Sequence, residues 1–406
     1  MKNNFPRLAI LSSRFPFPVE KGDKLRLYHQ IRYLSDFYDI YLFSLSEAEI
    51  PDPDYQEIKQ YCQSIFTYVE GKRNREFRVF LKYFDGVPSQ VNYFYSKKIG
   101  RNMWKDLIMT NPDVVYCQLF RMAPYVEKLP APKVLDIMDA FGNIAQLQAA
   151  SSRGISEKIF WSKESQLLKN YEHILKERFS SFTIISERDA DELKVINKQD
   201  IHIVRNGIDV DYFDSYDGTL PKNRFDISFI GNLEYRPNQE AAYYIANKMY
   251  PYFAEMGINL KVLIGGKGAE KLKSKITNDN IYLHGWYDDI REAYYSAPIF
   301  VAPIFLGSGM QNKVLEAMAC SRDVICSSHV MEAMPMLKGY AKIADTLDDY
   351  FNSYMDIRDR SEKNNEQNSP LDVLKETLTW DKQCNNLRKV LEDARKYHKW
   401  DIDQYH

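Results

Sequence analysis

The sequence predicts an α/β protein with two doubly wound parallel sheets, one in each half of the chain. Three observations support this fold class. Short apolar runs of strand length alternate with longer segments whose apolar residues repeat at helical spacing. The alternation begins again after a turn-rich stretch at 203–224, which interrupts the even spacing that a single eight-stranded barrel needs. Strand–helix–strand order favours parallel strands joined by right-handed crossovers.

Each expected element has a place in this pattern. Buried strands are expected at 8–12, 39–44, 114–117, 133–137 and 182–186 in the first half, and at 226–230, 260–264, 281–284, 299–302 and 324–327 in the second. The main helices are expected at 25–36, 156–179, 240–255, 312–319 and 371–406. The polar run at 356–368 is expected to be a solvated loop.

These positions predict the domain organisation. We expect an N-terminal domain over 1–203, a C-terminal domain over 204–380, and a helix over 381–406 that packs back on the N-terminal domain. The pair Asn206-Gly207 lies in the turn-rich stretch and is expected to be the hinge, because glycine accepts positive φ at little cost. The alternative is a simple tight turn between two fixed domains.

Composition excludes several classes of protein. The chain has 406 residues, of which 45% are hydrophobic and 27% charged, so wholesale disorder is excluded. Lys plus Arg (54) nearly balances Asp plus Glu (56), so no overall positive charge attracts nucleic acid. The five cysteines form no C-x-x-C pair, which favours reduced thiols in the cytoplasm. Apolar runs are too short for a membrane span or a signal peptide, so any membrane contact is expected to be peripheral.

Two loops carry candidate chemistry. The segment 12–24 is polar and places Gly22 just before a helix, where backbone can approach an anion. This signal is weak, because an ordinary strand-to-helix turn looks the same. The segment 306–319, L-G-S-G-M-Q-N-K-V-L-E-A-M-A, is stronger. Its backbone N–H groups at 309–311 can face a phosphate, Lys313 adds positive charge, and Glu316 can reach a ribose. The alternative is a helix start with a solvated Lys–Glu pair.

Several segments together resemble glycosyltransferase family four, whose members have the GT-B fold with two Rossmann-like domains facing a cleft. The similarity is greatest to the bacterial sugar transferases associated with exopolysaccharide and exosortase systems. The matching segments, in the family's order, are F-P-F-P-V-E-K-G-D-K-L-R, E-R-F-S-S-F-T-I-I-S-E-R-D-A, V-R-N-G-I-D-V-D-Y-F, F-I-G-N-L-E-Y-R-P-N, H-G-W-Y-D-D-I, G-M-Q-N-K-V-L-E-A-M-A and L-T-W-D.

The resemblance implies transfer of a sugar from a nucleotide-diphosphate donor with retention of configuration. Glu316 matches the second Glu of the family's Glu–seven residues–Glu motif, which contacts the ribose, whereas the first Glu is replaced by Ser308. Two cations that contact the diphosphate in many members are replaced by Asn232 and Pro237. We therefore expect Lys313, or else Arg236, to stabilise the leaving group. Arg236 as a surface residue is an equal alternative.

Aromatic and acidic residues complete the predicted site. Trp286 or Tyr287 is expected to stack on the base, unless both only fill a loop. No His follows the strand at 114–117, so Asp136 and Asp139 are the acidic candidates near the acceptor, with helix capping the preferred interpretation of Asp139. The predicted catalytic residues are Lys313, Glu316, Arg236 and Asp139, and the predicted donor contacts are Gly22, Asn206, Gly231, Asn232, Trp286, Tyr287, Ser308, Gly309, Met310 and Gln311. No metal and no cofactor is expected, because the nucleotide sugar is a substrate.

A basic and aromatic segment at 71–105 predicts contact with an anionic membrane. The segment has nine basic residues and only two acidic ones, Glu76 and Asp85, and aromatic residues lie between the basic ones. Such a mixture suits the headgroup region of a membrane. Single-stranded nucleic acid also suits this mixture, and a helical surface with an aromatic core face is the plain alternative.

Together these features predict a metal-independent retaining glycosyltransferase of bacterial cell-surface polysaccharide synthesis, with a UDP-sugar donor and a glycan or polyprenyl-linked acceptor. It is expected on the inner face of the cell membrane. The alternatives are a catalytically degenerate nucleotide-binding scaffold, favoured by Ser308, Asn232 and Pro237, and a nucleotide-sugar epimerase.

Overall fold

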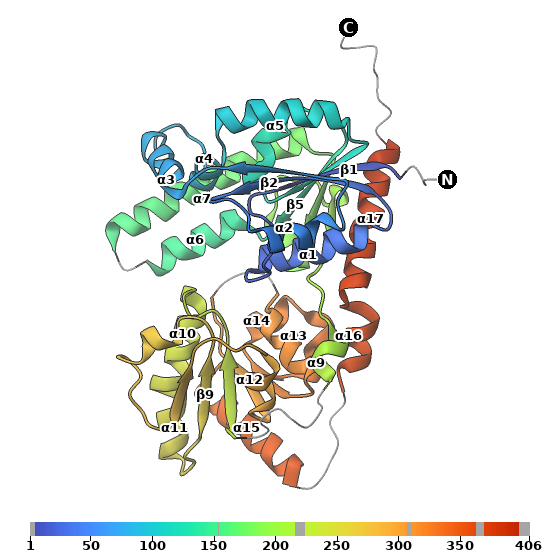
Figure 1. The fold of residues 1–406 in the computed structure, drawn as a ribbon. Helices are drawn as coiled ribbons and strands as arrows, with labels where there is room; N and C mark the ends of the chain where they lie inside the picture. The colour runs from blue at the N-terminus through green and yellow to red at the C-terminus, as the bar shows by residue number, and fades with distance from the viewer. Residues whose placement is uncertain (1–4, 153, 216–223, 307–309, 363–368, 398–406) are drawn as a thin grey trace. The chain divides into compact units, whose positions relative to one another are not determined.

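The computed structural model describes residues 5–152, 154–215, 224–306, 310–362 and 369–397. Contacts divide the chain into two compact units, shown in Figure 1. The N-terminal unit contains Met1–Asn206 and Trp380–His406, and the C-terminal unit contains Gly207–Thr379. Each unit has its own parallel sheet with helices on both faces, so each is described by itself.

The N-terminal unit is built on a seven-stranded parallel sheet in the order β3-β2-β1-β4-β5-β6-β7. Its strands are β1 (Arg7–Ser12), β2 (Asp39–Ser46), β3 (Ser64–Val69), β4 (Val114–Gln118), β5 (Lys133–Met138), β6 (Ser181–Ile184) and β7 (Ile201–Ile203). In register, Leu8 of β1 lies between Ile40 of β2 and Val114 of β4. These central strands are apolar on both faces because helices cover both.

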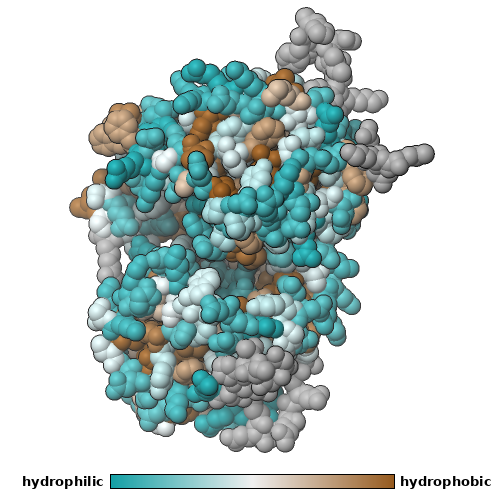
Figure 2. All heavy atoms as spheres, viewed as in Figure 1, coloured by the Kyte–Doolittle hydropathy of each residue, from teal (hydrophilic) through white to brown (hydrophobic). Residues whose placement is uncertain are grey.

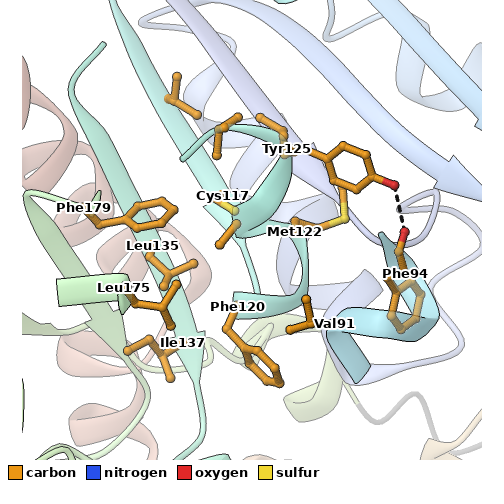
Figure 3. Packing of buried hydrophobic residues seen from close by; sticks show 14 of the residues in the cluster. Val91, Phe94, Cys117, Phe120, Met122, Tyr125, Leu135, Ile137, Leu175 and Phe179 are labelled. Carbon is orange, nitrogen blue, oxygen red and sulfur yellow. Dashed lines mark hydrogen bonds between the residues drawn. The ribbon is translucent and has the colours of Figure 1, made fainter. Parts of the chain in front are cut away.

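The helices of this unit enclose two hydrophobic clusters, one on each face of the sheet. They are α1 (Gly22–Leu34), α2 (Asp52–Lys59), α3 (Lys72–Leu81), α4 (Ser89–Phe94), α5 (Lys97–Thr110), α6 (Phe141–Ser151), α7 (Ile155–Arg178), α8 (Glu187–Glu192) and α17 (Trp380–Tyr397). Leu27 of α1 and Leu391 of α17 share one cluster with Leu8. The other cluster surrounds Phe120 and Tyr125, and Figure 3 shows the Tyr125 hydroxyl donating to the Phe94 carbonyl at 2.8 Å.

A buried ion pair joins the elements of the N-terminal unit. Arg26 of α1 donates from Nε to Asp136 of β5 at 2.8 Å, and both side chains are fully buried. Asp136 also accepts from the Tyr116 hydroxyl at 2.8 Å and from the Thr183 hydroxyl at 2.8 Å. Arg26 further donates to the Val204 carbonyl at 2.9 Å, so it holds the chain that leaves β7.

The C-terminal unit is built on a six-stranded parallel sheet in the order β10-β9-β8-β11-β12-β13. Its strands are β8 (Ile227–Ile230), β9 (Val262–Gly265), β10 (Ile281–His284), β11 (Ile299–Ala302), β12 (Asp323–Cys326) and β13 (Lys342–Ile343). Its helices are α9 (Val210–Asp214), α10 (Arg236–Tyr244), α11 (Tyr250–Glu255), α12 (Arg291–Tyr295), α13 (Asn312–Ala319), α14 (Ser328–Glu332), α15 (Leu347–Glu362) and α16 (Leu371–Thr377).

The structure corrects three element predictions. Residues 356–362, expected to be a solvated loop, are the end of α15, whose buried Tyr350, Tyr354 and Ile357 hold the helix on the sheet. The helix expected at 371–406 is interrupted after α16, where Thr379 forms an isolated bridge with Ile208 before α17 begins. The strands β3, β7 and β13 were not predicted. Among the described residues, no helix is long and apolar enough to cross a membrane.

Candidate functional site

Glycine-containing turns follow three neighbouring strands of the C-terminal sheet. The strands β8, β9 and β10 lie side by side, and backbone hydrogen bonds continue between their turns. The N–H of Gly231 donates to the Gly265 carbonyl at 2.9 Å, and the N–H of Gly266 donates to the His284 carbonyl at 2.9 Å. Ligands of open α/β sheets bind at the carboxyl ends of the strands, so these turns form the floor of a candidate site.

One of these positions requires glycine, and another leaves little room for a side chain. Gly266 has a φ of +121°, and a Cβ there would lie 2.1 Å from the Gly231 carbonyl oxygen. A Cβ at Gly231 would lie 3.1 Å from Cε of Lys313 and 3.1 Å from Nδ2 of Asn238. The lysine therefore crosses directly over the end of β8, and any side chain at 231 would displace it.

Lys313 is held over the turn that follows β8. Its ammonium donates to Oδ1 of Asn238 at 3.0 Å and to Oε1 of Gln311 at 2.8 Å. Both acceptors are neutral amides, so these bonds position the charge without neutralising it. Burial lowers the pKa of Lys313 to about 8, although Glu316 opposes this shift. A partly desolvated cation of this kind interacts strongly with a phosphate.

Glu316 lies one turn further along α13. One of its oxygens, Oε2, accepts from the hydroxyl of Tyr294 at 2.5 Å, and Tyr294 of α12 is fully buried. Burial raises the pKa of Glu316 above its usual range, although the Tyr294 hydrogen bond and Lys313 both act in the opposite direction. The tyrosine fixes the direction of the carboxylate, so the other oxygen can accept from a hydroxyl group of a ligand.

The residues just before α13 complete this part of the site. Gln311 occupies the N-cap position of α13, and its carbonyl accepts from the N–H of Val314 at 2.8 Å. Met310 is buried. The predicted contacts Ser308 and Gly309 lie outside the described residues.

Two predicted aromatic contacts follow β10 and differ in their surroundings. Trp286 is 65% exposed, so its ring is accessible to a base. Tyr287 stacks on His284 with ring centroids 4.1 Å apart, and burial raises the pKa of its hydroxyl to about 12. The Tyr287 ring also covers Gly265, where a Cβ would lie 3.1 Å from it. Tyr287 is therefore part of the packed floor.

The predicted residues Asn232 and Arg236 have different environments. The Asn232 carbonyl accepts from Nδ2 of Asn238 at 2.8 Å, which orients the amide that holds Lys313. Arg236 begins α10 with a side chain that is 44% exposed, and it pairs with Glu240 at 2.9 Å. The exposed pair favours the interpretation of Arg236 as a surface residue. The positive charge beside the turn after β8 is that of Lys313.

The N-terminal unit places polar side chains at the carboxyl end of β1. Gly22 is the first residue of α1, with nothing within 4 Å of its Cβ position. The carboxylate of the next residue, Asp23, accepts from Arg14 and, at 3.2 Å, from Arg121. Arg121 is buried and also donates to the hydroxyl of Ser13 at 2.9 Å.

The other predicted residues of this unit are structurally engaged. The interpretation of Asp136 as an acidic group near the acceptor is wrong, because this carboxylate is fully buried in the ion pair with Arg26. Oδ1 of the buried Asn206 accepts from the same Arg26 at 3.2 Å. Asp139 lies just before α6, whose N-cap position is taken by Ala140.

Sequence reasoning did not identify three residues that shape the site. Asn238 lies in the first turn of α10, Tyr294 lies in a short helix, and the turn after β9 contains Gly266. Only Gly266 left a signal in the sequence, as part of a Gly-Gly pair directly after an apolar run. The other two act through contacts between segments far apart in the chain.

Comparison with known structures defines the fold. Anabaena HepE in complex with UDP and glucose has a TM-score of 0.66 at 10% identity, covering 95% of this chain and 99% of that chain. A glycosyltransferase from Rickettsia africae has a TM-score of 0.64 at 11% identity, covering 98% and 100%. A trehalose 6-phosphate synthase from Burkholderia multivorans has a TM-score of 0.61 at 10% identity, covering 97% and 99%. The fold is GT-B, as predicted.

Comparison of sequences gives the family resemblance. Residues 224–340, which include the turns described above, match the family model described as glycosyl transferases group 1. An uncharacterized 44.6 kDa protein in the cps region of Klebsiella pneumoniae is 21% identical over 343 residues, which cover 79% of this chain and 83% of that protein. The resemblance to group 1 glycosyltransferases that the motifs predict is confirmed.

Proposed function

We propose that this protein is a retaining, metal-independent glycosyltransferase that takes a sugar from a nucleotide-diphosphate donor, with UDP as the favoured carrier. The observation that carries the proposal is the placement of Lys313 over the end of β8, one helical turn from the oriented carboxylate of Glu316. An ammonium for the diphosphate and an oriented carboxylate for the ribose are the groups that a nucleotide donor requires.

The role of Lys313 follows from the charge that develops during transfer. Breaking the bond between the sugar and the diphosphate leaves negative charge on the leaving phosphate. A pre-positioned cation stabilises that charge with little reorganisation, and this is usually the largest catalytic contribution. Two of the three N–H groups of Lys313 are used by Asn238 and Gln311, which leaves one for a phosphate oxygen.

The role of Glu316 is to bind rather than to transfer a proton. Its orientation by the buried Tyr294 leaves Oε1 to accept from a hydroxyl group, as in a ribose. In the proposed retaining mechanism, an oxygen of the donor phosphate takes the acceptor proton, so no protein base is needed. Positioning of the two substrates then supplies much of the rate.

UDP is favoured because Anabaena HepE, which shares the fold, was solved with UDP and with UDP-glucose. The relative in the cps region of Klebsiella pneumoniae supports a role in bacterial cell-surface polysaccharide synthesis. We propose a glycan or polyprenyl-linked acceptor. A lipid-linked acceptor requires the protein to work at the inner surface of the cell membrane.

A panel of thermal-shift measurements tests the proposal. UDP, GDP, dTDP and CMP are added to the full-length protein at equal concentrations. Ligand at about 100 times its dissociation constant stabilises the folded state by about 2.7 kcal/mol, and UDP is expected to give the largest shift. No shift with any of the four nucleotides would overturn the proposal, and binding without sugar transfer to any acceptor would favour a scaffold.

A further inference from the structure

Helix α3 turns two of its three arginines, Arg75 and Arg78, toward the protein. Arg75 is buried and donates to the carbonyls of Glu70 at 3.0 Å and Ser46 at 2.8 Å. Arg78 forms two bonds to the Glu70 carboxylate, at 2.6 and 2.8 Å. Both arginines belong to the basic segment at 71–105, which is expected to contact an anionic membrane. For Arg75 and Arg78 this expectation is wrong, because their side chains bond to the protein and hold α3 in place.

The outer side of α3 has polar residues at its start and large apolar side chains toward its end. Phe77 is 62% exposed, Phe80 78%, Leu81 62% and Phe84, in the turn that follows, 88%. The spacing of three and four residues places Phe77, Phe80 and Leu81 on one face of α3. A helix on a water-facing surface normally shows the reverse arrangement, with charges outside and phenylalanines inside.

A second segment adds to this surface. Ile155 and Ile159, one turn apart at the start of α7, are 82% and 61% exposed. The two segments are in contact, because Lys163 of α7 donates to the carbonyl of Tyr83 at 2.7 Å and lies 4.9 Å from the Phe84 ring centre. We call these side chains the apolar tip: Phe77, Phe80, Leu81, Phe84, Ile155 and Ile159. Figure 2 shows hydrophobic residues at the left edge of the N-terminal unit, over the region of α3 and the start of α7.

We propose that the apolar tip inserts into the headgroup region of a lipid bilayer and holds the protein at the membrane. The inference rests on the proposed function, because membrane binding would bring the protein to a lipid-linked acceptor. Aromatic and aliphatic side chains that project from helix ends suit this depth. Three acidic residues lie beside the tip: Glu76, Asp85 and Glu157. Glu76 and Asp85 each lie within 4 Å of a lysine, Lys72 and Lys82 respectively.

Charge and shape favour lipid over other partners. The exposed Arg73 and Lys158 flank the tip and can remain at the level of anionic headgroups while the apolar side chains enter the bilayer. A single-stranded nucleic acid would need stacking rings along a basic groove, whereas half of the tip is aliphatic. A second copy of the chain is the other possible occupant, and the experiment distinguishes it.

The test is sedimentation with vesicles of phosphatidylcholine containing about 30% phosphatidylglycerol, an anionic composition. The full-length wild type is compared with F80S/F84S and with the control variant M256S. Met256 is an apolar side chain of the C-terminal unit, 51% exposed, that does not belong to the apolar tip. We expect F80S/F84S to lower vesicle partitioning at least about tenfold and M256S to leave it unchanged. Because both phenylalanines are exposed, the thermal midpoint should stay the same.

Several outcomes overturn the proposal. Equal partitioning of F80S/F84S and wild type would mean that the tip does not contact lipid. If the wild type sediments as a dimer and F80S/F84S as a monomer, the tip binds a second copy of the chain. If the wild type binds a labelled single-stranded oligonucleotide and F80S/F84S does not, the tip binds nucleic acid. UDP binding by F80S/F84S is measured in parallel. If UDP binding persists while partitioning is unchanged, only the membrane proposal fails.

Discussion

At the residue scale, Glu316 should matter for ligand binding more than for folding. Glu316→Gln keeps an oxygen for the Tyr294 hydroxyl, so no buried donor is left without an acceptor. The lost charge should weaken UDP binding by about 1.5–3 kcal/mol, the range for a hydrogen bond to a charged group. Calorimetric titration measures this change, with the exposed Glu255→Gln as the control. An unchanged dissociation constant would contradict the ribose contact.

Lys313 should show a trade-off between binding and stability. Because burial lowers its pKa to about 8, the unfolded chain binds more protons than the folded one between about pH 8 and the ordinary lysine value. Keeping the ammonium charged therefore costs stability at pH 7, and this cost disappears as pH rises through that window. We expect Lys313→Met to be at least as stable as wild type at pH 7 in urea unfolding, with the difference shrinking above pH 8.

The same variant should lose the response of binding to pH. In wild type, UDP affinity should fall as pH rises through about 8, because Lys313 loses its proton in the free protein. Lys313→Met should bind UDP weakly at all pH values. A variant that unfolds at pH 7 would instead show that Lys313 has a structural role.

The sequence predicts the residues of this site that follow a strand or begin a helix, and it misses those that act across the fold. Lys313 and Glu316 are visible because a glycine-containing loop precedes an amphipathic helix. Asn238 and Tyr294 reach them from α10 and α12, at sequence separations of 75 and 22 residues. Asp136 was misassigned because a strand-end carboxylate looks the same whether it faces solvent or a buried arginine.

At the element scale, the buried pair of Arg26 and Asp136 should stabilise the N-terminal unit. Asp136→Ala removes the carboxylate partner of a fully buried guanidinium and the acceptor of the Thr183 hydroxyl. Breaking such a pair costs about 3–5 kcal/mol. Urea unfolding should show this loss, whereas Asp85→Ala, at an exposed turn, should change the free energy of unfolding by less than about 0.5 kcal/mol. A loss below about 1 kcal/mol for Asp136→Ala would contradict this account.

The turn after β9 should be sensitive to a single methyl group. Gly266→Ala places a Cβ 2.1 Å from the Gly231 carbonyl oxygen, so the turns after β8 and β9 must separate and Lys313 must move. Gly257 is the matched control, since it also has positive φ (+83°) but has nothing within 4 Å of its Cβ position. We expect Gly257→Ala to show only backbone strain, and Gly266→Ala to lose UDP affinity as well. Equal affinity in both variants would contradict the close approach.

The elements themselves were largely predictable where the pattern is long or fully apolar. The central strands of both sheets appear where apolar runs predict them, because helices on both faces keep these strands dry. The short edge strands β7 and β13 have few apolar residues and gave no signal. The polar end of α15 was taken for a loop because only one stripe of that helix is buried.

At the scale of the whole molecule, the chain passes between the two units twice, after Asn206 and before Trp380. Both ends are fixed within the N-terminal unit. Arg26 donates to Asn206 at 3.2 Å, and the ring of His29 stacks on that of Trp380 with centroids 4.4 Å apart. The helix α1 therefore anchors both crossovers, and backbone rotation at a hinge is expected from Gly207 onward.

The central claim is that the turns of the C-terminal unit bind the nucleotide of a sugar donor. Photolabelling of the full-length protein with 5-azido-UDP, followed by peptide mapping, tests it without any variant. The account predicts label within 231–316, concentrated near Trp286, and loss of that label when excess UDP is present. Label that UDP suppresses but that is confined to peptides of 1–206 would contradict the assignment.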